Sequence, residues 1–279
     1  MEFRALILVS ILFGTAVGVS CGGGSKTGTS SPPEPVATTT PVQLADTQTV
    51  SIESPDKTVL IGSLFESSKP NSPGLLLLHQ WESDRHSYDE LARILQKRGF
   101  TVLAIDGRGF GESVRTADGR EIKPDRSSAT VKAMLQDVGA SVDFLTKQPS
   151  VNPAKIGIVG ASYGSSLALI YAADEPKIRA VALLSPGLNY FGNMPTEPAV
   201  EKFTDRNSHN LLFIAAKDDK ESAEAVQKLN RMEVDNYRYP LMIYDSGGHG
   251  TALLKVGASE LISNFFANEF NFANLNVRP

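Results

Sequence analysis

The chain has 279 residues and a formal net charge of −4, with acidic and basic residues interspersed along its length. Without a long run of basic residues, it lacks the surface that nucleic-acid binding needs, so we expect no nucleic-acid partner. Its single cysteine, Cys21, excludes a disulfide bond within the chain. The length is sufficient for one sizeable hydrophobic core.

The first 21 residues have the layout of an export signal. An apolar stretch from Ala5 to Val19 is too short to span a bilayer comfortably, but it suits the apolar region of a secretory signal. The run Gly18-Val19-Ser20-Cys21 resembles the lipobox of bacterial lipoproteins, with glycine standing where leucine is favoured. We therefore expect residues 1–20 to be a signal peptide and Cys21 to carry acyl chains.

Within residues 21–46, the run 22–41 is rich in Gly, Ser, Thr and Pro and contains almost no apolar residue. Such a segment cannot bury enough apolar surface to fold, so we predict a disordered tether. The expected arrangement is an exported protein anchored to a membrane in the cell envelope, with a folded domain at 47–279.

From Thr47 onward the chain has the pattern of a folded domain, beginning with a hairpin of two strands at 47–54 and 57–67. Short apolar runs then alternate with stretches of helical spacing. The further predicted strands are 75–79, 100–106, 155–159, 178–186, 210–219 and 239–246. The predicted helices are 86–99, 129–148, 163–175, 221–232 and 251–270.

This alternation predicts an α/β fold: a mostly parallel, twisted sheet of about eight strands with helices on both faces. In such sheets ligands bind beyond the carboxyl ends of the strands. Reactive residues are therefore expected in the loops that follow those ends.

A serine between two glycines follows the predicted strand 155–159, in the run Gly160-Ala161-Ser162-Tyr163-Gly164. A G-x-S-x-G turn between strand and helix lifts the serine hydroxyl above the sheet. From average glycine and serine usage, roughly one chain in ten of this length contains the pattern by chance. Its placement between a strand and a helix is what makes Ser162 the predicted nucleophile.

A neutral serine needs a base, and in this type of fold the chain order is serine, acid, histidine. Two histidines follow Ser162. His209 precedes the strand at 210–219 and so belongs to the wrong end of the sheet. His249 follows the strand at 239–246 in a glycine-rich loop, and it is the predicted general base.

The acid is expected at the end of the strand 210–219, where Asp218 and Asp219 are adjacent. Either could orient His249, and either could cap the next helix, because Asp suits a first helical turn. We favour Asp219 as the acid and keep Asp218 as the alternative. Asp245 lies on the histidine's own strand and is expected to order that loop.

A developing oxyanion needs two backbone N–H donors. One is expected from Tyr163, directly after the nucleophile. The other is expected from the loop after the strand 75–79, where Trp81 is our first choice and Gln80 the alternative.

Five segments in this order, each at a strand end, resemble the α/β-hydrolase superfamily, closest to its dienelactone-hydrolase-like and esterase or S33-peptidase-like bacterial members. They are LLLLHQW, AIDGRGFGES, GIVGASYGSS, LLFIAAKDD and YDSGGHGT. The resemblance implies hydrolysis of an ester-like bond through an acyl-enzyme, with Ser162, His249 and Asp219 as the triad and no cofactor or metal. Gln80 stands where the family usually has glycine. Residues 186–205, where many relatives insert a helical cap, are short, so little or no cap is expected.

The leading hypothesis is a membrane-tethered serine hydrolase, a carboxylesterase that acts on small esters. A peptidase or amidase of the same fold is the alternative within the same chemistry. A non-catalytic binding lipoprotein on this scaffold is the alternative from another class, and the complete Ser-Asp-His set speaks against it.

Overall fold

The computed structural model describes residues 44–205, 210–232 and 239–270, all within one compact unit of the chain. The predicted signal peptide 1–20, Cys21 and most of the tether 21–46 lie outside the described residues, and so does His209. In the described part of the chain, no helix is both long enough and apolar enough to cross a membrane.

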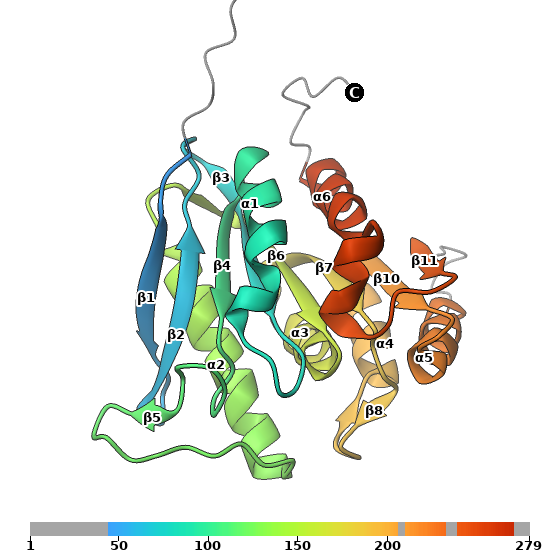
Figure 1. Ribbon diagram of the computed structural model, residues 1–279, viewed down its shortest axis with the longest axis horizontal. Coiled ribbons are helices and arrows are strands. Elements are labelled where there is room, and N and C mark those ends of the chain that lie inside the picture. The colour runs from blue at the N-terminus through green and yellow to red at the C-terminus, as the bar shows by residue number, and fades with distance from the viewer. Residues whose placement is uncertain (1–43, 206–209, 233–238, 271–279) are drawn as a thin grey trace, which may run out of the picture. The chain divides into compact units, whose positions relative to one another are not determined.

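Within the described residues, nine strands form one sheet in the order β1-β2-β4-β3-β6-β7-β10-β11, with β5 beside β2 (Figure 1). The strands are β1 (Thr47–Glu53), β2 (Thr58–Phe65), β3 (Ser72–Leu78), β4 (Thr101–Ile105), β5 (Arg115–Thr116), β6 (Val151–Ala161), β7 (Ile178–Leu184), β10 (Leu211–Ala216) and β11 (Leu241–Tyr244). The first strands pair antiparallel, β1 with β2 and β2 with β4 and β5. All pairs from β4 through β3, β6, β7 and β10 to β11 are parallel, which confirms the predicted sheet.

Helices cover both faces of this sheet (Figure 1). They are η1 (Arg85–Tyr88), α1 (Asp89–Lys97), α2 (Ser128–Thr146), α3 (Tyr163–Asp174), α4 (Glu197–Thr204), α5 (Lys220–Asn230), η2 (Gly250–Val256) and α6 (Ala258–Glu269), where η marks a 3-10 helix. The leucines of β3 show why the central strands are continuously apolar. Leu76 and Leu78 pack with residues of α2 and α3, whereas Leu75 and Leu77 pack with residues of α1 and α6 on the other face.

Besides the unpredicted two-residue β5, the structure differs from the predicted elements in two main places. The predicted helix 251–270 is two helices, because Gly257, with φ +112°, ends η2 before α6 begins. Residues 186–205 contain a hairpin of two short strands, β8 (Asn189–Tyr190) and β9 (Met194–Pro195), followed by the eight-residue α4. The segment is therefore small, as its length predicted.

Candidate active site

The candidate nucleophile lies on a sharp turn between β6 and α3. Ser162 has φ +54°, a value that residues other than glycine rarely adopt. A Cβ on Gly160 would lie 2.3 Å from the carbonyl oxygen of Gly164, and a Cβ on Gly164 would lie 2.6 Å from that of Leu78. Only glycine fits at these two positions, because the turn presses against itself and against the end of β3. The close packing fixes the Ser162 hydroxyl at the carboxyl ends of the strands.

Three side chains from different strand ends form one hydrogen-bonded chain. His249 Nε2 lies 2.7 Å from Ser162 Oγ, and His249 Nδ1 lies 2.6 Å from Asp219 Oδ2. Ser162 follows β6, Asp219 follows β10 and His249 follows β11, so parallel pairing of the strands gathers them at one edge. With the Nδ1 proton donated to the carboxylate, Nε2 is free to accept the serine proton. The structure thus brings together the three residues that the sequence singled out for this chemistry.

The two adjacent acidic residues make different contacts. Asp219 faces His249, whereas the carboxylate of Asp218 accepts hydrogen bonds from the backbone N–H groups of Gly247 and Gly248 at 3.1–3.2 Å. Asp219 occupies the N-cap position of α5, but its side chain makes no capping bond there. Asp218, rather than Asp245, therefore orders the histidine loop.

Asp245 does not have the role that we expected for it. Its side chain is exposed and pairs with Lys217 at 2.5 Å. An exposed pair of this kind contributes little to the conformation of a neighbouring segment.

The Asp219 carboxylate is held in its charged form. Burial raises its pKa. Hydrogen bonds from His249 and from the Ser222 and Ser185 hydroxyls, together with the charge of His249, lower the pKa by more than burial raises it. The net result is a pKa below its ordinary value. An ionised carboxylate at this position would stabilise an imidazolium at His249.

His79, which is buried, orders the loop that follows β3. Its Nδ1 lies 2.7 Å from the carbonyl oxygen of Gln80, and its Nε2 accepts a hydrogen bond from the N–H of Gly107 at 2.8 Å. The donor at Nε2 fixes the neutral ring with its proton on Nδ1. Burial also lowers the pKa of His79, which keeps the ring neutral. Because a trans peptide is planar, a Gln80 carbonyl turned toward His79 turns the Trp81 N–H the opposite way.

The turn after β4, in the segment AIDGRGFGES, is held by buried carboxylates. Asp106 accepts hydrogen bonds from the N–H groups of Arg85 and Glu112, both at 2.8 Å, and also pairs with the Arg85 guanidinium. Arg108 pairs with Asp137 at 2.6 Å. These contacts fix the turn whose Gly107 N–H donates to His79. The turn therefore helps to hold the loop that follows β3.

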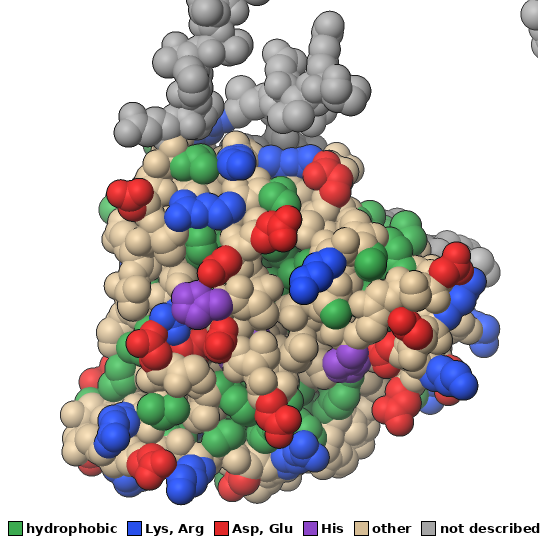
Figure 2. Space-filling view, in the orientation of Figure 1, with side chains coloured by type: hydrophobic (Ala, Val, Ile, Leu, Met, Phe, Trp, Pro, Cys, Tyr) green, Lys and Arg blue, Asp and Glu red, His purple; other side chains and the backbone are tan. Residues whose placement is uncertain are grey.

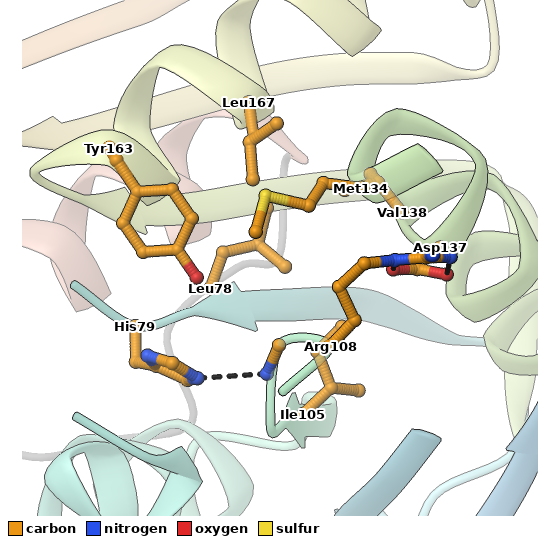
Figure 3. A pocket seen from close by; sticks show the side chains of 10 residues that line it. Leu78, His79, Ile105, Arg108, Met134, Asp137, Val138, Tyr163 and Leu167 are labelled. Carbon is orange, nitrogen blue, oxygen red and sulfur yellow. Dashed lines mark hydrogen bonds and ion pairs between the residues drawn. The ribbon is translucent and has the colours of Figure 1, made fainter. Parts of the chain in front are cut away.

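A small cavity lies behind the turn of Ser162. Figure 3 shows the Tyr163 hydroxyl pointing into it, with His79 and the Arg108–Asp137 pair at its wall. Its volume of about 20 Å³ corresponds to roughly one water molecule. The cavity is therefore too small to hold a substrate.

Aromatic rings pack against one another at the predicted oxyanion loop. The ring of Trp81 lies 4.9 Å from that of Phe191 and 5.4 Å from that of Tyr163, in edge-to-face contacts. Phe191 lies in the β8–β9 turn. The guanidinium of Arg126 lies 5.3 Å from the Trp81 ring and 5.0 Å from the Phe191 ring, within cation–π range. The hairpin and the segment before α2 therefore meet beside the loop of Trp81.

Sequence reasoning missed two residues beside the triad. Ser185 follows β7, is fully buried and has φ +47°. Its Oγ accepts a hydrogen bond from the N–H of Gly250 at 2.9 Å, and its carbonyl oxygen accepts one from the Tyr190 hydroxyl at 2.9 Å. Burial raises the pKa of the Tyr190 hydroxyl, and the Ser162 side chain partly offsets this shift. The signal for Ser185 was present, because it directly follows an apolar strand, as the triad residues do.

With this geometry established, comparison with known sequences identifies the family. The sequence model of the family described as serine aminopeptidase, S33, matches residues 73–239, more than half of the chain. The chain belongs to this family. This S33-family protein is accordingly a hydrolase with the α/β-hydrolase fold.

Individual relatives of the S33-family protein agree with this assignment. A probable 2-oxo-3-(5-oxofuran-2-ylidene)propanoate lactonase of Bradyrhizobium is 28% identical over 57% of this chain and 65% of its own. The curated relatives are matched over partial lengths, for example 34% of one and 68% of another. Among solved structures, the dienelactone hydrolase of Anabaena variabilis has a TM-score of 0.58 at 18% identity, covering 81% of this chain and 97% of that one. An esterase of Pyrococcus furiosus has a TM-score of 0.61 at 21% identity, covering 85% and 99%. These structural likenesses show the fold.

Proposed function

We propose that this protein is a serine hydrolase that cleaves ester bonds of small substrates through an acyl-enzyme. The observation that carries the proposal is the continuous contact from Asp219 through His249 to the hydroxyl of Ser162. In this arrangement a serine hydroxyl, a base and an orienting carboxylate meet within hydrogen-bond distance at the strand ends, which nucleophilic acyl transfer requires.

The reaction would proceed in two halves. Ser162 Oγ attacks the ester carbonyl carbon while His249 Nε2 accepts its proton. The tetrahedral adduct then expels the alcohol, which takes that proton. In the second half His249 deprotonates water, water attacks the acyl carbon, and the acid leaves as Ser162 regains its proton. Asp219 stabilises the imidazolium in both halves.

The negative oxygen of each tetrahedral adduct would be held by the N–H groups of Tyr163 and Trp81. Tyr163 supports this role because it is the first residue of α3, where backbone N–H groups lack partners within the helix. Trp81 supports it because His79 turns the Gln80 carbonyl away and so directs the next N–H to the other side. Gln80 remains the alternative second donor.

Two features support small esters as the substrate class. The relatives described as a lactonase, a dienelactone hydrolase and an esterase all take their names from ester-like bonds. The rings of Trp81 and Phe191 beside the predicted oxyanion loop offer an apolar surface for an acyl or alcohol group. On the face that Figure 2 shows, acidic and basic side chains are interspersed, so an uncharged substrate meets no large area of one charge.

The test is labelling by a fluorophosphonate, which forms a covalent adduct with an activated serine. We expect the wild type to be labelled and Ser162→Ala to be unlabelled. Ser166→Ala is the matched control, because the Ser166 hydroxyl is buried in the same helix without a hydrogen-bond partner in the described chain. A wild type that resists labelling would show that the serine is not activated and would refute the proposal.

The family description favours one second candidate, an aminopeptidase or amidase that uses the same three residues. Turnover of a 4-nitrophenyl acyl ester is compared with that of an aminoacyl 4-nitroanilide. The ester proposal predicts that kcat/KM for the ester exceeds that for the anilide by a larger factor than the intrinsic reactivities of the two bonds differ. Preference for the anilide would assign the protein to peptide chemistry instead.

We propose further that Cys21 tethers the hydrolase to a membrane in the cell envelope, on the strength of the run Gly18-Val19-Ser20-Cys21. Metabolic labelling with a radioactive fatty acid, followed by membrane fractionation, tests this. The wild type should be labelled and sediment with membranes, and Cys21→Ser should do neither. An unlabelled wild type would contradict the tether.

A further inference from the structure

Side chains from three other strand ends hold the backbone around His249. We propose that Ser185 and Gln80, together with Asp218, act as positioning residues that set the reach of the His249 ring to Ser162. These three residues are called the histidine clamp below. The inference rests on the proposed function, because it assigns a role relative to His249 as the base.

Asp218 holds the segment before the histidine. It follows β10, and its carboxylate accepts the N–H groups of both Gly247 and Gly248 at 3.1–3.2 Å. Two consecutive amides directed at one carboxylate fix the direction in which the chain enters His249.

Ser185 and Gln80 hold the segment after the histidine. The N–H of Gly250 donates to Ser185 Oγ at 2.9 Å. Gln80 Oε1 accepts two hydrogen bonds from Thr251, one from its N–H at 2.7 Å and one from its hydroxyl at 2.9 Å. Side chains from the ends of β10, β7 and β3 thus fix four backbone amides on the two sides of His249.

The loop needs such contacts because its own sequence gives it little rigidity. Gly247, Gly248 and Gly250 surround His249, and the last two have φ +71° and +62°. Glycine has more backbone freedom than any other residue, so ordering this loop requires fixed partners from outside it. An imidazole on an unheld loop would sample positions out of reach of Ser162.

Ser185 connects this loop to the acid as well. Its Oγ accepts from Gly250, and the same hydroxyl is one of the groups that lower the pKa of the Asp219 carboxylate. The Tyr190 hydroxyl donates to the Ser185 carbonyl, and Ser185 is fully buried with a positive φ. A strained and buried residue with hydrogen bonds to both Gly250 and Tyr190 is typical of a functional rather than a packing role.

Gln80 connects the loop to the predicted oxyanion donors. Its carbonyl oxygen faces His79, while its side chain reaches Thr251. A Cβ on Gly250 would lie 2.3 Å from Gln80 Oε1, which shows how closely the two loops approach. A glycine at position 80 would lack this link, so the departure from the family's usual residue acquires a function here.

The experiment compares Gln80→Met and Ser185→Ala with two controls that remove similar groups elsewhere. Gln96→Met removes a buried amide that bonds Ala45 and Glu66 far from the site, and Ser263→Ala removes a buried hydroxyl without a partner among the described residues. We expect kcat on a 4-nitrophenyl ester to fall about 10- to 100-fold in the two clamp variants, because small misplacements of catalytic groups cost that much. KM should stay within about twofold, because the substrate is not contacted. Both controls should retain wild-type kcat.

The pH profile of kcat/KM separates positioning from general loss of structure. Ser185→Ala should move the acid limb to higher pH, because the Ser185 hydroxyl lowers the pKa of Asp219, and without it the carboxylate attracts the imidazolium proton more strongly. Gln80→Met should leave the limb in place and lower the plateau. If Ser185→Ala does not fold, Ser185→Gly gives the same test, since glycine keeps the positive φ and removes the hydroxyl.

Folded clamp variants with wild-type kcat and an unmoved acid limb would overturn the inference. Ser162→Ala distinguishes that result from failure of the proposed function. If Ser162→Ala is inactive while the clamp variants are normal, the triad stands and the clamp falls. If Ser162→Ala retains activity, the proposed function itself falls.

Discussion

The turn that carries Ser162 and the loop that carries His249 reach the same edge of the sheet by different means. The turn is fixed by its own backbone, since a Cβ at either Gly160 or Gly164 would overlap a carbonyl oxygen. The loop also contains glycines, but a Cβ on Gly248 would find its nearest neighbour at 3.6 Å. In the turn, glycine thus lets backbone pack directly on backbone. In the loop, Gly248 has open space, and Gly247 and Gly250 are approached only by side chains such as Gln80.

This difference divides the site into two parts. The rigid part is the turn of Ser162, and the held part is the loop of His249, which depends on side chains from elsewhere. The position of Ser162 depends on steric contacts within a short segment. The position of His249 depends on side chains, Asp218 and Gln80 among them, that lie 29 to 171 residues in the sequence from the loop amides they bind. Changes in the turn should therefore damage the fold, whereas changes around the loop should damage the chemistry first.

The largest expected effect concerns the two acidic residues that face the loop. Asp219→Asn should lower kcat/KM about 10³- to 10⁴-fold, because the amide favours the wrong tautomer and cannot stabilise the imidazolium. Asp218→Asn keeps an acceptor for one glycine amide and should lose about tenfold or less through positioning alone. Steady-state ester hydrolysis measures both. The reverse order would make Asp218 the acid.

The next-largest effect compares a glycine-to-alanine substitution in the turn of Ser162 with one in the loop of His249. Gly160→Ala forces a Cβ to within 2.3 Å of backbone and should destabilise the fold by about 3 kcal/mol or more, since the neighbouring carbonyl cannot move aside. Gly248→Ala has room and should cost about 1–2 kcal/mol, the price of a positive φ. Urea unfolding followed by circular dichroism gives both values. Equal losses would contradict the division into a rigid and a held part.

The smallest effect is a pH dependence of stability, which the contact between Asp219 and His249 should show and the turn of Ser162 should not. The folded-state pKa of Asp219 lies below its ordinary value of 3.8. A depressed pKa contributes stability that is fully present above the unfolded value and is lost as the pH falls through the folded value. The stability of the wild type relative to Asp219→Asn should therefore decrease between about pH 5 and pH 2. The difference between wild type and Gly160→Ala, which is steric, should stay constant over the same range.

Much of the fold followed from local sequence. Leu75–Leu78 predicted a buried strand because all four side chains must be covered, two by helices on each face. The run from Gly160 to Gly164 predicted a strand-to-helix turn for steric reasons that act within five residues. The single helix predicted for 251–270 was wrong because helical spacing continues through Gly257, whose φ of +112° breaks it.

The sequence by itself determined the α/β architecture, the turn of Ser162 and the order in which serine, acid and histidine occur along the chain. Only the tertiary structure decided which aspartate faces His249, that Asp218 rather than Asp245 orders its loop, and that Ser185 and Gln80 reach the same loop. The physical reason is the range of the forces involved. Strand and helix periodicity and glycine sterics act between near neighbours, whereas the partners of a flexible loop depend on which strand ends the sheet brings side by side.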